Sequence, residues 1–172
     1  MEGHAAEYFL LGYPEIIVSA DGDIQVFRDG RTDRIGSEME SAGTDPEADD
    51  GNTTYRNRQN GFWELNFSGT PVEHGRTGKF PICDGMQILL LSKGASQALS
   101  PFRIYEDPEY LMSDAKSRGL EYVWNMIRHY EAGDPERRKF RRTRSCENVA
   151  AALLEIRADG EEGKNQGGAW NG

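Results

Sequence analysis

The stretch that decides the fold is Phe62-Trp-Glu-Leu-Asn-Phe67, followed after a Gly-rich bend by Gly85-Met-Gln-Ile-Leu-Leu-Leu91. In the first part Trp63, Leu65 and Phe67 alternate with polar residues, and this period of two predicts a strand with one buried face. The second part is apolar almost without interruption, and we interpret it as a short helix that other elements cover on nearly all sides. The sequence therefore predicts a β-ribbon packed against a buried helix.

A β-hairpin is predicted upstream, over residues 15–28. Two β-prone runs flank Asp21-Gly22, and Asp-Gly is favoured where both central residues of a two-residue turn need a positive φ. Residues 29–52 are rich in acidic and small polar side chains, and such a segment buries too little apolar surface to offset the entropy of ordering. We therefore expect a flexible acidic linker at 29–52, and the sequence leaves open whether the N-terminal unit (1–28) packs on the main domain.

Two helices are predicted after the central stretch. Asp107-Pro108-Glu109 is typical of a helix start, with Asp as the N-cap and Pro in the first turn. Gly133-Asp134-Pro135-Glu136 is typical of one helix ending and another beginning, and helical spacing of apolar residues continues to Ile156. So short a connection predicts an antiparallel helical hairpin over 105–158. The polar, Gly-rich residues 159–172 are expected to be a disordered tail.

An ordered set of residues in the central stretch carries a resemblance to a known module. The set is Tyr55-Arg56, Gly61, Trp63, Leu65, Phe67, Gly69, Val72, Gly85-Met86, Leu90-Leu91 and Gly94. With the break at 133–137, this order resembles a winged-helix-like module of bacterial signal-transduction regulators, often found near ATPase domains, over roughly residues 52–157. The resemblance implies an α+β fold with a winged-helix-like module at 53–104, and a regulatory role.

Composition limits the class of protein. The 172 residues carry a net charge of −9, and mean hydropathy is −0.73. The acidity is uneven, because residues 1–54 hold 13 Asp and Glu against 3 Lys and Arg. Cys83 and Cys146 are far apart, and we expect both to be small buried residues in a reducing compartment. With neither a signal-peptide pattern nor an apolar run of membrane-spanning length, we predict a soluble cytoplasmic protein.

The strongest charge feature is a run of cations expected on the second helix. It consists of Arg137, Arg138, Lys139, Arg141, Arg142 and Arg144. A basic helix can neutralise the phosphates of DNA, so these six residues are the candidate nucleic-acid site. Two alternatives stay open: a solvated face whose cations pair with neighbouring carboxylates, or a surface for an acidic protein partner, including the acidic residues 45–50 of this chain.

Catalysis, metal binding and cofactor binding have little support in the sequence. The three histidines, His4, His74 and His129, are scattered, so we predict no catalytic residue, no metal site and no cofactor. Trp63 and Trp124 are expected in the core rather than as stacking platforms. The sequence therefore predicts a non-enzymatic regulatory module associated with DNA; the alternative is a protein-interaction or scaffold module that uses the helical hairpin and the acidic linker. The oligomeric state is not predicted.

Overall fold

The computed structural model describes residues 4–32, 34–35, 55–142 and 144–157. In chain order its elements are β1 (Ala5–Leu10), β2 (Glu15–Ala20), β3 (Asp23–Arg28), the 3-10 helix η1 (Thr70–His74), β4 (Arg76–Pro81), β5 (Gln87–Leu91), α3 (Lys93–Ser96), α4 (Pro108–Arg118), α5 (Leu120–Ala132) and β6 (Ala151–Glu155). The class is α+β, as predicted. The predicted linker (29–52) lies mostly outside the described residues, and the predicted tail (159–172) lies wholly outside them.

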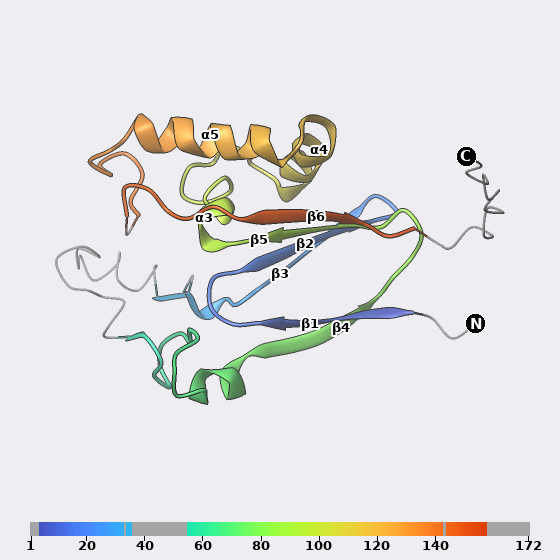
Figure 1. Cartoon of the computed structure of the whole chain (residues 1–172), viewed down its shortest axis with the longest axis horizontal. Helices are drawn as coiled ribbons and strands as arrows, with labels where there is room; N and C mark the ends of the chain where they lie inside the picture. The colour runs from blue at the N-terminus through green and yellow to red at the C-terminus, as the bar shows by residue number, and fades with distance from the viewer. Residues whose placement is uncertain (1–3, 33, 36–54, 143, 158–172) are drawn as a thin grey trace, which may run out of the picture.

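The described elements form three layers (Figure 1). The central layer is an antiparallel sheet of four strands in the order β3-β2-β5-β6. Helices α4 and α5 lie above one face of this sheet, and the antiparallel pair β1–β4 lies below the other face. The sheet is therefore covered from both sides.

The predicted hairpin is confirmed as β2 and β3. At its turn Asp21 has φ 51° and Gly22 has φ 87°, the positive values that the Asp-Gly signal anticipates. Strand β2 also pairs along its other edge with β5, so that Ile17 lies opposite Leu89. The hairpin thus belongs to the main sheet, which answers the question that the sequence left open.

The predicted buried helix around residues 86–91 is wrong, because this segment is the central strand β5. Side chains of a strand alternate between the two faces of a sheet. Leu89 and Leu91 enter the core under the helices, whereas Ile88 enters the core above β1–β4. A strand covered on both faces needs apolar residues at every position, and this produces the uninterrupted apolar run.

The predicted strand at 62–67 is also wrong. Phe62 makes an isolated bridge with Arg56, and no strand follows it. Phe62 is buried, but Leu65 is 75% exposed and Phe67 is fully exposed, so the alternating apolar residues have no common buried face. Pro71 and Val72, which follow this stretch, belong to the 3-10 helix η1.

The helical region agrees with the prediction in its first half only. Helix α4 begins after Asp107, whose carboxylate accepts a hydrogen bond of 2.9 Å from the Glu109 N–H. Gly119 (φ 86°) separates it from α5, which ends before Gly133 as expected. Residues 134–142 and 144–150 then form no helix, and 151–155 form β6. The helix pair is therefore α4–α5, and the predicted hairpin over 105–158 is wrong.

The larger core lies between the helices and the sheet. Phe102, Leu111 and Ile127 are almost fully buried there beside Ile17 and Leu89. Replacing such a buried leucine by alanine costs about 2–5 kcal/mol, so this layer supplies much of the stability. Trp124 is 42% exposed on α5, which corrects its expected place in the core. In the described part of the chain, the helices are too short or too polar to span a membrane.

A smaller core lies between the sheet and the β1–β4 pair. The ring of Phe27 lies 4.9 Å from the ring of Tyr8 and 5.3 Å from that of Phe80. Near the β6 edge, Leu90 and Leu154 are 38% and 42% exposed. The β1–β4 pair therefore covers the β2–β3 side of this face more fully than the β5–β6 side.

Candidate interaction surfaces

The segment after α5 is folded around one carboxylate, that of Asp134. Its Oδ1 accepts hydrogen bonds from the backbone N–H groups of Arg138 (2.9 Å) and Lys139 (3.1 Å). Its Oδ2 accepts one from the N–H of Phe140 (2.9 Å). Burial disfavours the ionised carboxyl, but these hydrogen bonds and that of Arg142 outweigh it and lower the pKa of Asp134 to about 2. An ionised Asp134 therefore holds residues 138–140 in a turn that is incompatible with a helix.

The Arg142 side chain lies inside this loop and donates hydrogen bonds to several of its oxygen atoms. Its Nη1 donates to Asp134 Oδ2 (3.0 Å) and to the Phe140 carbonyl (3.0 Å), and its Nη2 donates to the Ser145 carbonyl (3.2 Å). The side chain is only 2% exposed, and the guanidinium lies 5.3 Å from the Phe102 ring centroid. Arg142 is therefore a structural cross-link between the loop and the helix-side core, and this corrects its expected place on a nucleic-acid surface.

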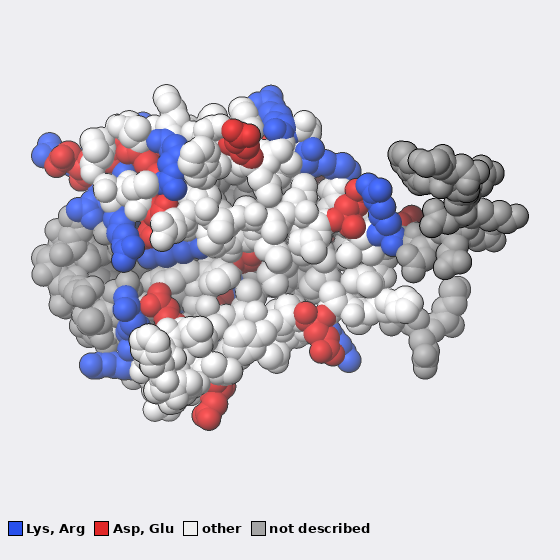
Figure 2. Space-filling view, viewed as in Figure 1, with Lys and Arg blue, Asp and Glu red and all other residues white. Residues whose placement is uncertain are grey.

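The six predicted site residues are consequently divided by the fold. They do not share a helix, because the described residues 134–142 and 144–150 contain none. Arg137 is half-buried with φ 56°, whereas Arg138, Lys139, Arg141 and Arg144 are exposed. We call these four exposed residues the cation loop. Lys and Arg side chains are concentrated at the end of the molecule where α5 finishes (Figure 2).

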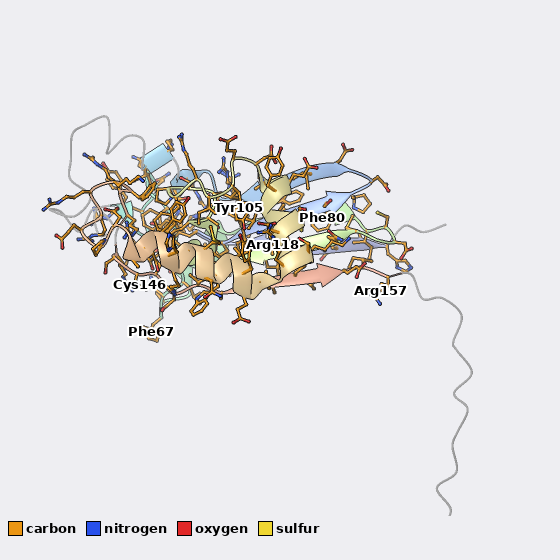
Figure 3. All side chains as sticks on the ribbon, turned by 90° about the horizontal axis from the view of Figure 1, so that it is seen from above. Phe67, Phe80, Tyr105, Arg118, Cys146 and Arg157 are labelled. Carbon is orange, nitrogen blue, oxygen red and sulfur yellow. The ribbon has the colours of Figure 1, made fainter. Side chains whose placement is uncertain are left out.

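A second polar network ties the following residues to α5. Buried Glu131 pairs with Arg128, and its Oε1 accepts a hydrogen bond of 3.0 Å from the Glu147 N–H. Arg128 also contacts the Cys146 sulfur, at 2.6 Å, and donates to the Glu147 carbonyl. Cys146 lies at the outer surface near the end of α5 (Figure 3), contrary to its expected burial, whereas Cys83 is half-buried.

The arrangement around Cys146 does not activate the thiol. Loss of water around the sulfur and the neighbouring Glu131 carboxylate raise the pKa of Cys146, even though the residue as a whole is exposed. A raised pKa keeps the thiol protonated, and the thiolate is the nucleophilic form. Among the described residues, no group of three or more His, Cys, Asp and Glu is placed to hold a metal ion.

The other notable surface lies around η1. The rings of Trp63 and His74 stack with centroids 3.6 Å apart and an interplanar angle of 13°. Phe9 of β1 lies against Gly75, directly after η1, where an added Cβ would come within 2.2 Å of the Phe9 ring. Trp63 is half-buried in this stack and belongs to none of the described core clusters, which corrects its expected place in the core.

The residues around η1 include the most exposed apolar side chains of the described chain. Exposed fractions are 112% for Phe67, 75% for Leu65, 49% for Phe9 and 46% for Val72. We call these four residues, with the Trp63–His74 stack, the η1 surface. Phe67 points away from the body of the protein (Figure 3).

An ion pair with a buried carboxylate lies next to the η1 surface. The Asp29 carboxylate, with an exposed fraction of 0%, pairs with Arg31 and with Arg76, whose Nε lies 3.3 Å away. Burial opposes ionisation of Asp29, but the hydrogen bonds and charge of Arg31, with the charge of Arg76, lower its pKa. Arg31 also donates to the His74 carbonyl at 2.8 Å. The expected linker thus begins with an ordered anchor, Asp29, that fixes the end of η1.

The sequence holds no direct signal for this anchor, because its partner Arg76 lies 47 residues from Asp29 in the chain. It did contain one signal for the η1 surface. Three large apolar residues alternate in 63–67, but no second β-prone run follows closely enough to pair with them. Side chains with a strand pattern and no strand partner are left exposed.

Comparisons with known proteins add no assignment to these surfaces. No family model, no curated protein and no solved structure matches this chain.

Proposed function

We propose that this chain is a non-enzymatic binding module that docks on another protein through the η1 surface. The observation that carries the proposal is the exposure of Phe67 and Leu65 beside a stacked Trp63. Single exposed apolar residues are common on soluble proteins, but a cluster of them marks interaction sites. Aromatic side chains such as Phe67 and Trp63 are enriched in the cores of protein interfaces, and tryptophan is among the residues that dominate binding energy.

The preorganisation of this surface also supports protein binding. The Asn66 side chain accepts hydrogen bonds from the Ser68 N–H (3.0 Å) and hydroxyl (2.7 Å), which shapes the turn after Phe67. The Trp63–His74 stack and the bond from Arg31 to the His74 carbonyl fix the other side. A surface that is ordered before binding loses less conformational entropy when a partner docks.

A displayed library of random peptides provides the test. We expect binders selected on the intact protein to lose at least about tenfold in affinity against Leu65→Ser/Phe67→Ser, as loss of a hot-spot residue costs more than about 1.4 kcal/mol. The matched control is Val26→Ser/Tyr110→Ser, because Val26 and Tyr110 are also exposed, at 38% and 62%, and lie elsewhere. Binders that tolerate the first variant as well as the control contradict the proposal.

A footprint of the bound peptide gives an independent readout. Amide exchange is expected to slow in residues 63–75 on binding and to stay unchanged in α4. Protection confined to another part of the molecule would assign the binding surface there instead.

A further inference from the structure

The charge of the protein is divided between its described and undescribed parts. The described residues hold 19 Lys and Arg against 18 Asp and Glu, a net charge of +1. The remaining residues hold 1 Lys against 11 Asp and Glu, a net charge of −10. The low pI of the whole chain therefore does not apply to the described residues, whose cations are able to create local positive potential.

The fold turns the cation loop outward. Asp134 binds the backbone of residues 138–140 from the inner side, and Arg142 fills the space behind them. Both inner groups are buried, with exposed fractions of 7% for Asp134 and 8% for Arg142. Arg137 is half-buried, whereas Arg138, Lys139, Arg141 and Arg144 are exposed to solvent.

Three of the nearby carboxylates are already engaged, and Glu136 is the exposed carboxylate that remains in this segment. Glu131 is bound to Arg128, and Glu147 lies 3.4 Å from Lys93. Asp134 is committed to Arg142 and to the loop backbone. Within the described residues, the four members of the cation loop form no ion pair of their own. Their charge is thus available to an external anion.

We propose that the cation loop binds the phosphate backbone of nucleic acid, without reading its sequence. Duplex DNA carries about one charge per 1.7 Å, and neutralising its phosphates releases condensed counterions. An extended acidic peptide carries at most one charge per about 3.3 Å and condenses fewer ions. Four cations on one short loop therefore favour a polyphosphate over an acidic polypeptide. Sequence readout is not expected, because a short irregular loop presents no helix or strand to a groove.

The salt dependence of binding tests the proposal quantitatively. We use fluorescence anisotropy of the full chain with a short labelled DNA duplex of mixed sequence. Four phosphate contacts predict a slope of log affinity against log salt of about −3.6, which is about a 100-fold loss between about 50 and 200 mM salt. In Arg138→Ser/Arg141→Ser the slope is expected to fall to about −1.8, so that the same salt change costs only about tenfold.

The matched control removes two arginines elsewhere. Arg118 and Arg157 are 55% and 80% exposed, and both lie away from Cys146 (Figure 3). Arg118→Ser/Arg157→Ser changes the net charge by the same amount, and its slope is expected to equal that of the unmodified protein. An equal loss in both variants would show that net charge alone governs binding, and the proposal would fail.

Two further outcomes would overturn the proposal. One is the absence of salt-sensitive DNA binding at low salt. The other is tighter binding of polyglutamate than of the duplex at equal salt, which would assign the loop to an acidic protein partner. Because the η1 surface shares no residue with the cation loop, the peptide experiment and the DNA experiment succeed or fail independently.

Discussion

Two buried carboxylates, Asp29 and Asp134, support the two surfaces in different ways. Asp29 accepts hydrogen bonds from Arg31 (2.8 Å) and from Arg76 (3.3 Å), which is 47 residues away in the chain. Asp134 instead accepts three backbone N–H groups from residues four to six positions ahead. The first therefore joins distant segments, whereas the second shapes a single loop.

This difference determines what each carboxylate controls. Through Arg31 and the His74 carbonyl, Asp29 fixes where η1 lies relative to the sheet. Asp134 fixes which cations of its own loop face solvent and which one, Arg142, faces inward. Loss of the first should displace one surface, whereas loss of the second should release a loop that is anchored to α5.

The largest effect is expected for Arg142→Met. The substitution removes a guanidinium that is 2% exposed, which leaves buried Asp134 without its cationic partner and two carbonyls without this donor. Breaking a buried ion pair in this way costs about 3–5 kcal/mol. Urea unfolding measures the loss, with Arg141→Met as the control. Because Arg141 is exposed, its change should stay within about 0.5 kcal/mol, and equal effects at both positions would contradict the role assigned to Arg142.

A smaller effect is expected for Asp29→Asn. The amide keeps the size of the side chain but loses the charge that Arg31 and Arg76 contact, and a hydrogen bond to a charged group contributes about 1.5–3 kcal/mol. We expect a loss of about 2 kcal/mol in the free energy of unfolding. Amide exchange should also speed up in 70–76 while 134–142 stays unchanged. Faster exchange in both regions would show that the two carboxylates do not act locally.

The sequence predicted the features that depend on neighbouring residues. Asp21-Gly22 and Asp107-Pro108 act within a few positions, and both the hairpin and the start of α4 are confirmed. The run at 86–91 was ambiguous, because a buried helix and a strand covered on both faces share the same apolar pattern. Its length of about six residues suits a strand better than a helix, and it forms β5.

The cation loop was less predictable, because its geometry depends on the contacts of the Asp134 carboxylate. The run 137–144 contains five arginines of the same type, and nothing in their spacing selects Arg142 as the inward one. Helical spacing through residue 156 was equally misleading, since the bonds from residues 138–140 to Asp134 replace helical bonds. Residue type predicted a cationic surface, but the Asp134 contacts decide which cations belong to it.

The pH dependence of stability in acid provides a further test of the two carboxylates, Asp29 and Asp134. Both carboxyls have a pKa below the ordinary value of 3.8, so each stabilises the fold fully above that pH and loses its contribution as the pH falls through the lowered pKa. For Asp134 this window runs from about pH 3.8 to about pH 2. The stability difference between the unmodified protein and Asp29→Asn should therefore be constant above pH 5 and shrink below pH 3.8. A difference that grows in acid would contradict the ionised state of Asp29.

The smallest effect is expected for Lys93→Met, which tests a connection that is only partly buried. The Lys93 ammonium lies 3.4 Å from the Glu147 carboxylate and 4.3 Å from the Tyr13 ring centroid, with 32% of its side chain exposed. Partly exposed pairs contribute at most about 1 kcal/mol, and methionine retains the apolar contact with the ring. We expect a loss below about 1 kcal/mol by urea unfolding, and smaller still at high salt, because screening weakens the Coulomb attraction. A loss as large as that of Arg142→Met would mean that the segment around Glu147 depends on Lys93 rather than on Glu131 and Arg128 of α5.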